Sequence, residues 1–425
     1  MSFVQLTPPS GPVQAQIQLT SSKSESNRAL IINALTGFRC TLHNVSEARD
    51  TQTLIRLLQS DDTVADVLDA GTTMRFLTAY FAVSGKHKTL TGTPRMCERP
   101  IGLLVDALRT LGADIDYLRQ EGYPPLATRG FTPSDTNRVS VRGDVSSQYI
   151  SALLMIGPAL PHGLEIELTG TIGSRPYIEM TIAQMRHFGA VVEADWDTKI
   201  LRVGPTPYTP QDYAVESDWS GASYWYSTLA LAPEGSEIEL LGLKEKSLQG
   251  DSAIADIMRP LGVESTFFAD GGRRSGGPAS GVRLTRIPAQ ASLSWDFSHC
   301  PDLAQTVAVC CAVKQIPLTL TGIESLKIKE TDRVAALQNE LPKIGAELVE
   351  IEPNHRYEVR PIATIDGQQV TPEIDTYDDH RMAMAFAPAA MRQQLVIHEP
   401  NVVMKSYPSF WTDFGQAAEV AIHEP

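Results

Sequence analysis

Residues 101–114 read IGLLVDALRTLGAD, an amphipathic run that ends at a glycine and leads into a short alternating run. The same ending recurs at three further places, and the glycines follow one another at intervals of roughly 70 to 85 residues. The four endings are Leu111-Gly112-Ala113-Asp114, Phe188-Gly189-Ala190-Val191, Leu261-Gly262-Val263-Glu264 and Ile344-Gly345-Ala346-Glu347. Because glycine favours a left-handed helix C-cap, each ending predicts a helix that passes into a strand.

A second type of segment recurs in the same rhythm, a short polar turn that opens a run of small and apolar residues. Its members are residues 22–35, 70–81, 144–155, 218–231, 301–313 and 378–390. From the second member onward the starts lie roughly 75 to 82 residues apart, and the first interval is about 48. The two patterns together predict six copies of one α/β unit, each with two helices and several strands. The strand expected first in the chain is the alternating stretch 13–19.

The six openings carry Ser, Asp and Thr, which are typical N-cap residues. The runs that follow are nearly all apolar, so we expect buried helices. A helix N-terminus that faces a cavity offers free N–H groups and a positive dipole end to an anion. Six such starts would make a strong anion site. The simpler interpretation is that each is only a capped core helix.

The composition is that of an ordinary soluble globular protein. Of the 425 residues, 42% are hydrophobic and 20% are charged, and no apolar run reaches the length of a membrane span. The N-terminus lacks the pattern of a secretion signal. Five cysteines at irregular spacing predict neither disulfides nor zinc and fit a reducing cytoplasm. The net charge of −14 argues against nucleic acid or an anionic membrane as a partner.

Basic residues gather in a few short segments, several of them at the helix openings. They are Lys23, Arg28, Arg75, Arg99, Lys329, Arg333, Arg381 and Lys405. Lys329 and Arg333 are four residues apart, and we expect both on one face of a helix, where the like charges favour a counter-anion. Arginine suits bidentate recognition of phosphate or carboxylate, and lysine acts as a point charge. Each residue alone could be a surface cation, but the set predicts a small, highly anionic ligand.

Two carboxylates lie among these cations. Asp302 opens the helix predicted over 301–313, and Glu330 follows Lys329 directly. A carboxyl group beside fixed cations has a lowered pKa unless burial opposes it, so either residue could act as a base. The alternatives are an N-cap for Asp302 and a first-turn helix carboxylate for Glu330.

Other chemistries have weaker support. Asp379 and His380 could suggest an acid–base pair or metal ligands, but the nine histidines show no ligand spacing, so we expect no metal. Ser146, Ser147 and Gln148 lack a nucleophile-elbow motif and are interpreted as donors to a phosphate. No phosphate-binding loop or dinucleotide fingerprint occurs, so no nucleotide cofactor is expected.

Eight segments, in order, resemble the 5-enolpyruvylshikimate-3-phosphate (EPSP) synthase family. They are SKSESNRA, LDAGTTMR, LTGTPRMCERPIGLLVDAL, VSSQYISALLM, SRPYIEMT, IKETDR, YDDHRMAMAF and MKSYP, within residues 17–414. The resemblance implies an α/β fold of two similar domains, each of three βαβαββ units about a pseudo-threefold axis, with the active site in the interdomain cleft. It places residues 1–20 and 217–425 in the first domain and 21–216 in the second. It also implies a cytoplasmic monomer without a cofactor.

The resemblance assigns roles to matching residues. The residues implied to bind shikimate 3-phosphate are Lys23, Ser24, Arg28, Ser146, Ser147, Gln148, Ser174, Tyr177, Asp302, Ser325 and Lys329. The residues implied to bind phosphoenolpyruvate are Lys23, Gly71, Arg99, Gln148, Arg333, Arg381 and Lys405. Asp302 resembles the base for the 5-hydroxyl and Glu330 the acid for the methylene carbon, with Lys23 and Lys329 nearby. The implied reaction adds the hydroxyl to phosphoenolpyruvate and then eliminates phosphate from a tetrahedral intermediate.

Several positions depart from the family pattern. Asp69 and Asp378 stand where asparagine is common, Cys97 replaces a common lysine, and Thr20-Ser21 replaces Pro-Gly. Ser325 also replaces an asparagine, so its contact is expected either to pass through water or to be lost. About twenty residues are missing between Ser60 and Asp69, which accounts for the short first interval. Asp69 is the most consequential departure, because it adds negative charge beside an expected anion site.

Two rival functions remain open. The sister enolpyruvyl transferase that acts on a UDP-amino sugar shares the fold and uses a reactive cysteine on a glycine-rich loop. Cys97 lies in a comparable region, but its setting, PRMCERP, is of the shikimate type. A non-catalytic anion-binding relative is the second rival, and the presence of Lys23, Asp302, Lys329 and Glu330 argues against it.

Overall fold

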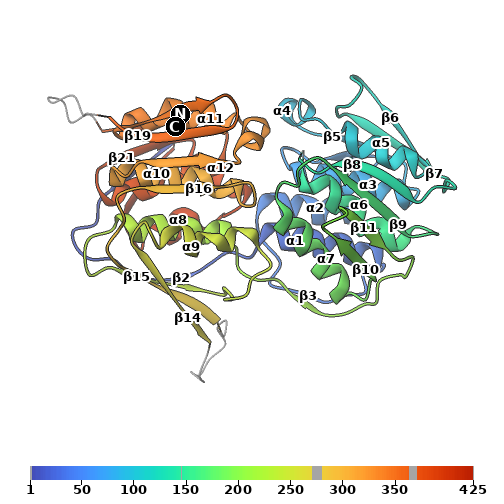
Figure 1. Ribbon diagram of the computed structural model, residues 1–425, viewed down its shortest axis with the longest axis horizontal. Helices are drawn as coiled ribbons and strands as arrows, with labels where there is room; N and C mark the ends of the chain where they lie inside the picture. The colour runs from blue at the N-terminus through green and yellow to red at the C-terminus, as the bar shows by residue number, and fades with distance from the viewer. Residues whose placement is uncertain (1, 145, 270–279, 363–370, 425) are drawn as a thin grey trace. The chain divides into compact units, whose positions relative to one another are not determined.

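The computed structural model describes residues 2–144, 146–269, 280–362 and 371–424. The chain divides into two compact units (Figure 1). The first unit comprises Met1–Ser22 and Glu216–Pro425, and the second comprises Lys23–Val215. Each unit mixes helices with several sheets around its own hydrophobic core, which confirms the predicted α/β class.

Five four-stranded sheets share one pattern of strand pairing, one parallel pair followed by two antiparallel pairs. In the second unit, β4 (Val64–Asp66) pairs parallel with β5 (Lys88–Thr91), which continues antiparallel to β7 (Leu126–Phe131) and then β6 (Ala113–Tyr117). The sheet of β8 (Arg138–Arg142), β9 (Leu164–Thr169), β11 (Ile200–Val203) and β10 (Val192–Asp195) repeats this order. The sixth copy is reduced to β3 (Leu42–His43) and β12 (Tyr213–Ala214), which pair in parallel.

The first unit holds the other three four-stranded sheets. One consists of β2 (Gln14–Gln18), β13 (Glu237–Leu241), β15 (Ser280–Arg286) and β14 (Val263–Ala269). The second consists of β16 (Leu293–Asp296), β17 (Leu318–Thr321), β19 (Arg356–Pro361) and β18 (Ala346–Glu352). The third consists of β20 (Glu373–Ile374), β21 (Leu395–His398), β1 (Phe3–Thr7) and β22 (Glu419–His423). The recurrence predicted from the sequence is therefore a recurrence of sheet topology.

The helices expected at the six polar openings are all present and mostly buried. In the second unit, α1 (Lys23–Leu35), α3 (Gly71–Val83) and α6 (Ser147–Ile156) pack against one another. In the first unit, α8 (Trp219–Leu231), α10 (Ala304–Lys314) and α12 (His380–Phe386) do the same (Figure 1). Their apolar surface is removed from water on nearly every side, which explains why these sequences show no polar face.

The remaining α-helices of the described residues form a second set. In the second unit it comprises α2 (Arg49–Gln59), the short α4 (Pro94–Cys97), α5 (Gly102–Thr110) and α7 (Arg175–His187). In the first unit it comprises α9 (Ile254–Met258), α11 (Arg333–Glu340) and α13 (Phe410–Phe414). Among the described residues, no helix is both long and apolar enough to cross a bilayer.

The predicted glycine caps are confirmed at Gly112 and Gly189, which follow the ends of α5 and α7. Gly345 caps the 3-10 helix η5 (Leu341–Ile344), and Gly262 closes a turn after α9, which ends at Met258 with its cap position at Arg259. The φ angles of Gly112, Gly189, Gly262 and Gly345 are +108°, +85°, +98° and +87°, and a strand follows each glycine within a few residues. At Gly112 a side chain would also collide, because an added Cβ would lie 1.9 Å from the carbonyl oxygen of Thr132. The glycine is therefore required both by backbone conformation and by the close approach of the chain at Thr132, just after β7.

The cap position is described at five of the six openings, and the N-cap prediction holds at three of them and is wrong at two. Ser146, Asp218 and Asp379 each accept a hydrogen bond from a backbone N–H of the first helical turn. The cap position of α3 is Ala70, which offers no side-chain acceptor. At α10 a 3-10 turn, η3 (Pro301–Leu303), precedes the helix, so the cap position falls to Leu303. Asp302 lies within that turn and is not an N-cap.

Residues 268–282 are rich in glycine and serine, a composition that predicts an exposed hairpin or loop. β14 and β15 run antiparallel up to Ala269 and Ser280. Residues 270–279 between them lie outside the described residues.

Candidate active site

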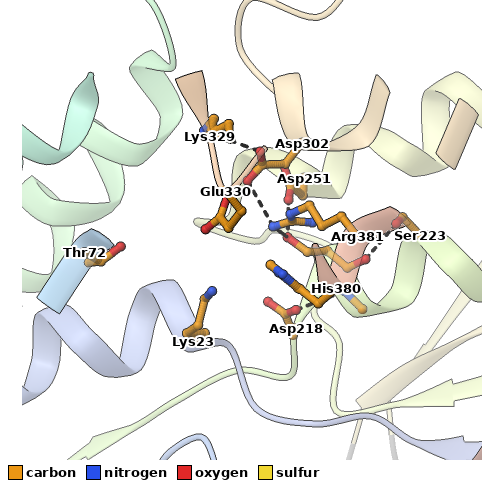
Figure 2. A network of polar contacts seen from close by, with 12 residues as sticks. Lys23, Thr72, Asp218, Ser223, Asp251, Asp302, Lys329, Glu330, His380 and Arg381 are labelled. Atoms are coloured by element: carbon orange, nitrogen blue, oxygen red, sulfur yellow. Dashed lines mark hydrogen bonds and ion pairs between the residues drawn. The ribbon is translucent and has the colours of Figure 1, made fainter. Parts of the chain in front are cut away.

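Asp302 of the first unit is surrounded by three cations. Its Oδ1 lies 3.5 Å from Lys329 Nζ and 3.0 Å from Arg333 Nη1, and its Oδ2 lies 3.0 Å from Arg381 Nη2. Figure 2 shows Lys329 and Arg381 reaching this carboxylate from different elements. The side chain is 20% exposed, so the carboxylate remains open to a ligand.

The charge environment sets the protonation of Asp302. Burial alone would raise the pKa of this carboxyl, but Arg381, Lys329 and Arg333 outweigh it and hold the pKa well below its usual range. Asp302 is therefore a carboxylate at neutral pH. In the ligand-free protein it is also a weak base, because the same cations that stabilise the negative charge resist its protonation.

Arg333 connects three carboxylates within the first unit. Its Nε donates to Asp379 Oδ2 at 2.6 Å, and its Nη1 and Nη2 bond Asp302 and Glu330 at 3.0 Å each. Its side chain is only 2% exposed. Burial would lower the pKa of Arg333, but Asp379, Glu330 and Asp302 raise it above its ordinary value. Arg333 is thus a permanent cation that fixes the two carboxylates singled out in the sequence.

The local structure around Lys329 and Glu330 corrects one expectation. Lys329 and Arg333 do not share a helix face, because α11 begins only at Arg333, and Lys329 has an extended backbone. Asp332 sets this start by accepting hydrogen bonds from the N–H groups of Val334 and Ala335. Glu330 therefore precedes the helix and is not a first-turn helix carboxylate. Lys329 and Arg333 meet instead at Asp302.

Lys405 and Arg381 complete this group. Lys405 ends the 3-10 helix η7 (Pro400–Lys405), is 1% exposed, and lies 3.6 Å from Glu330 Oε1. Arg381 also contacts the hydroxyls of Tyr224 and Ser220, at 3.4 and 3.5 Å. We call Asp302, Lys329, Glu330, Arg333, Asp379, Arg381 and Lys405 the carboxylate–cation cluster. The predicted site residue Ser325 lies in the 3-10 helix η4 (Glu324–Ile328) and is half-buried.

The second unit carries the remaining predicted site residues. Lys23 is the first residue of α1, and its Nζ lies 3.1 Å from Asp50 Oδ2 of α2. The Lys23 side chain is 17% exposed and that of Asp50 is 4% exposed. The buried carboxylate thus holds the ammonium group at the opening of the helix.

Arg28 is buried among polar and aromatic groups one turn further along α1. Its guanidinium donates to Thr181 Oγ1 at 2.6 Å, to the Ser24 carbonyl at 2.9 Å and to Ser151 Oγ at 3.1 Å. The ring of Tyr177 lies 6.0 Å from it. Burial lowers the pKa of Arg28 to about 10, against the opposing effects of Tyr177 and Glu25, so Arg28 stays charged at neutral pH.

The serine and glutamine side chains predicted as phosphate donors lie at helix starts. Ser146 caps α6 by accepting from the Gln148 N–H, and Ser147 is the buried first residue of that helix. The Gln148 amide Nε2 donates to Thr72 Oγ1 at 3.1 Å, which links the starts of α6 and α3. Ser174 stands at the cap position of α7 in a left-handed conformation, with φ of +52°, and does not cap with its side chain.

Gly71 lies against two guanidinium groups at the start of α3. A Cβ added at Gly71 would lie 2.6 Å from Arg75 Nη1 and 2.8 Å from Arg99 Nη1. Arg75 donates to the Gly71 carbonyl at 2.9 Å and to the Pro100 carbonyl at 3.2 Å. Both arginines are buried. The missing side chain therefore allows two cations to converge on the helix N-terminus, where an anion would meet them.

Two departures from the family pattern have structural partners. Asp69 is bonded by Arg49, whose Nη2 lies 3.0 and 2.9 Å from its two carboxylate oxygens. Cys97 ends α4, is half-buried, and its Sγ lies 3.7 Å from the Gly92 carbonyl.

Sequence reasoning missed residues that act through these side chains. The sequence suggests Asp379 only as part of an acid–base pair or a metal site, yet it holds Arg333. The sequence does not indicate Asp50 or Thr72, yet they hold Lys23 and Gln148. The only local signal was an acid or hydroxyl at the start of a helix. Among the described residues, no group of three or more His, Cys, Asp or Glu could hold a metal ion.

Comparison with known proteins identifies the family of the chain. The family model for EPSP synthase (3-phosphoshikimate 1-carboxyvinyltransferase) matches residues 7–60 and 54–414. The chain is 48% identical over 411 residues to a 3-phosphoshikimate 1-carboxyvinyltransferase of Bacteroides fragilis, with 95% of each chain covered. It is 38% identical over 442 residues to the enzyme of that name from Cellvibrio japonicus, covering 98% of this chain and 99% of the relative.

A solved structure supports the fold. The EPSP synthase from Acinetobacter baumannii superposes with a TM-score of 0.76 at 18% identity, with both chains fully covered. The family match and the relatives, together with the α/β fold, place the chain in the enolpyruvyl transferase class of enzymes. Within that class, the chain belongs to the EPSP synthase (3-phosphoshikimate 1-carboxyvinyltransferase) family.

Proposed function

We propose which residues of the two units act as base, as acid and as substrate ligands in the family's reaction. The chain transfers the enolpyruvyl group of phosphoenolpyruvate to the 5-hydroxyl of shikimate 3-phosphate and releases phosphate. The observation that carries the assignment of roles is the carboxylate–cation cluster, in which Arg333 joins Asp302 to Glu330.

Asp302 is proposed as the base that accepts the proton of the 5-hydroxyl. Its partial exposure, its ionised state and its ring of cations support this role. A substrate phosphate or carboxylate that engages Arg381 or Lys329 would offset part of their charge. The pKa of Asp302 would then rise toward a value useful for general-base catalysis. In this proposal substrate binding itself activates the base.

Glu330 is proposed as the acid that protonates the methylene carbon of phosphoenolpyruvate. It is 14% exposed and fixed by Arg333 and Lys405. Protonation of the methylene leaves positive charge on the carbon that bears the phosphate, and the 5-hydroxyl oxygen attacks that carbon as its proton passes to a base. The tetrahedral intermediate then loses inorganic phosphate and a methyl proton, which restores the double bond. A carboxylate near the developing positive charge lowers this barrier.

The remaining cations and donors are proposed as ligands of the two anions. For phosphoenolpyruvate they are Lys23, Gly71, Arg99, Gln148, Arg333, Arg381 and Lys405. For shikimate 3-phosphate they are Lys23, Ser24, Arg28, Ser146, Ser147, Gln148, Ser174, Tyr177, Asp302, Ser325 and Lys329. Arg333 and Arg28 already serve several internal partners, which supports an additional role in fixing their neighbours.

The domain assignment, 1–20 with 217–425 and 21–216, and a cytoplasmic, monomeric state without a cofactor belong to the same proposal. The five cysteines are free, which supports a reducing compartment. The proposed substrates are small molecules, and neither nucleic acid nor a membrane is proposed as a partner.

A phosphate-release assay with phosphoenolpyruvate and each acceptor tests the function. We expect phosphate release with shikimate 3-phosphate and none with UDP-N-acetylglucosamine, since both the family match and the PRMCERP setting of Cys97 favour the former. Release only with the UDP-sugar would overturn the assignment in favour of the sister enzyme. No release with either acceptor, despite substrate binding, would favour the non-catalytic alternative.

A further inference from the structure

A strained turn precedes two residues of the carboxylate–cation cluster. The Asp379 N–H donates to the Thr376 carbonyl at 2.9 Å, which closes a β-turn over residues 376–379. The two central residues, Tyr377 and Asp378, have φ angles of +54° and +55°. Aspartate, like the asparagine common in the family, tolerates this left-handed conformation, whereas a bulky aromatic residue seldom adopts it. The conformation at Tyr377 therefore needs support from the surrounding structure.

Glu340 provides this support. Its side chain is 1% exposed, and its Oε1 accepts a hydrogen bond from the Tyr377 hydroxyl at 2.8 Å. Its Oε2 accepts from the Asp375 N–H at 3.1 Å and lies 2.7 Å from Lys343 Nζ. Glu340 is also the last residue of α11, where the helix dipole disfavours a carboxylate, so helix stability does not explain its presence. The hydrogen bonds to residues 375 and 377 give this buried acid a role in holding the turn.

The turn leads directly to the side chains of the cluster. Asp379 accepts from Arg333 Nε at 2.6 Å and from the Arg381 N–H at 2.9 Å. Arg381 Nη2 in turn lies 3.0 Å from Asp302 Oδ2. Because Arg333 begins α11 and Glu340 ends it, the turn is bonded to both ends of one helix. A turn that lost its conformation would therefore change how Asp379 meets Arg333 and how Arg381 meets Asp302.

The turn is also bonded to the segment that carries Lys405. The buried Thr376 donates through its hydroxyl to Glu399 Oε2 at 3.0 Å. Glu399 immediately precedes η7, whose last residue is Lys405. The turn thus connects the segments that carry Arg333, Arg381 and Lys405, the three cations of the first unit proposed to bind phosphoenolpyruvate.

We propose that Tyr377 and Glu340 are positioning residues for phosphoenolpyruvate. Their hydrogen bond holds the turn in a conformation that an aromatic residue disfavours, and the turn fixes Asp379 and Arg381 within the cluster. The inference rests on the proposed function of Arg333 and Arg381 as ligands of this substrate.

Steady-state phosphate release by the full chain, with Tyr377→Phe as the main variant, tests the inference. This change removes only the hydroxyl. We expect KM for phosphoenolpyruvate to rise about three- to tenfold, as the loss of one hydrogen bond to a charged acceptor would cause. KM for shikimate 3-phosphate, whose proposed ligands lie mostly in the second unit, should stay within about twofold of the original value. An unchanged KM for phosphoenolpyruvate would overturn the inference.

Asp378→Gly separates this role from general destabilisation. Glycine adopts a positive φ without a steric penalty, so the turn should depend less on the hydroxyl of Tyr377. In the Asp378→Gly background, Tyr377→Phe should raise KM for phosphoenolpyruvate no more than about twofold over Asp378→Gly alone, a comparison that also cancels any effect of the lost charge. A rise as large as in the original chain, or a parallel rise in both KM values with a lower melting temperature, would count against the positioning role.

Matched controls distinguish this inference from the proposed function. Tyr357→Phe removes the same kind of hydrogen bond, which Tyr357 of β19 donates to Glu350 of β18 at 2.7 Å, and should leave KM unchanged. Arg381→Lys should raise KM for phosphoenolpyruvate, because lysine lacks the planar guanidinium. If Arg381→Lys raises it and Tyr377→Phe does not, only the positioning role fails. If neither does, the proposed role of Arg381 fails, and the inference fails with it.

Discussion

Replacing Arg333 with methionine should destabilise the first unit strongly, because three carboxylates lose one shared cation. Arg333 is 2% exposed, and its partners Asp302, Glu330 and Asp379 are 20%, 14% and 0% exposed. Methionine is apolar and flexible enough to fill much of the space, so the main loss is electrostatic rather than a cavity.

The magnitude follows from burial and size. Removing one partner of a buried, hydrogen-bonded ion pair costs about 3–5 kcal/mol. For a unit of about 230 residues, each kcal/mol shifts the melting temperature by about 2–4 °C, so the transition of the first unit should fall by about 6–20 °C at pH 7. Arg283→Met, which breaks an exposed pair with Glu239 on the same unit, should cause a far smaller shift.

Differential scanning calorimetry at a series of pH values measures the melting temperature of the first unit in the original chain and in each variant. The pKa of Asp302 is depressed in the folded protein, so its stabilising contribution is present above its unfolded pKa of about 4 and is lost as the pH falls toward the folded value. The gap between the original chain and Arg333→Met should therefore be full at pH 7 and narrow below about pH 4. A shift at pH 7 no larger than that of Arg283→Met, or a gap that widens on acidification, would refute the reasoning.

Three further variants test the site. Gly71→Ala should raise KM for phosphoenolpyruvate several-fold with little change for shikimate 3-phosphate, since its Cβ would displace Arg75 and Arg99; equal changes in both KM values, measured by phosphate release, would contradict this. Thr72→Val removes the hydrogen-bond acceptor for Gln148 and should weaken the binding of both substrates about two- to tenfold, while Thr72→Ser keeps the acceptor and should leave binding unchanged; equal effects of the two variants on binding would count against the contact. Lys329→Met removes a cation 3.5 Å from Asp302 and should move the acid limb of kcat, which reports the substrate-bound enzyme, to higher pH, because the pKa of Asp302 rises; an unmoved or lowered limb would show that Asp302 is not the group observed.

Local patterns predicted the repeat but not the contacts between repeats. The left-handed conformation of Gly112 and its three counterparts could be predicted because it depends on the glycine itself. The six inner helices could be assigned because burial on every side leaves a recognisable apolar run. The sequence could not predict that Lys329 lies outside the helix that contains Arg333. The side chain of Asp332 caps that helix and sets its start at Arg333.

The candidate active site shows the same difference between local motifs, which the sequence reveals, and contacts between repeats, which it does not. The cations and the two carboxylates stand out in short motifs, whereas the groups that orient them come from distant copies of the repeat. Arg333 and Asp379 are 46 residues apart, and Thr72 and Gln148 are 76 apart. Such pairs exist only once the sheets and helices are assembled, so neither partner marks the other in the sequence.

Glu330→Gln tests the account most directly, because Glu330 is the proposed proton donor and its position depends on Arg333 and Lys405. Turnover should be measured by phosphate release, and binding of shikimate 3-phosphate by calorimetry. The account predicts that kcat falls by about two to four orders of magnitude, as expected for loss of a general acid, while binding stays within a fewfold of the original value. Undiminished kcat with intact binding would contradict it.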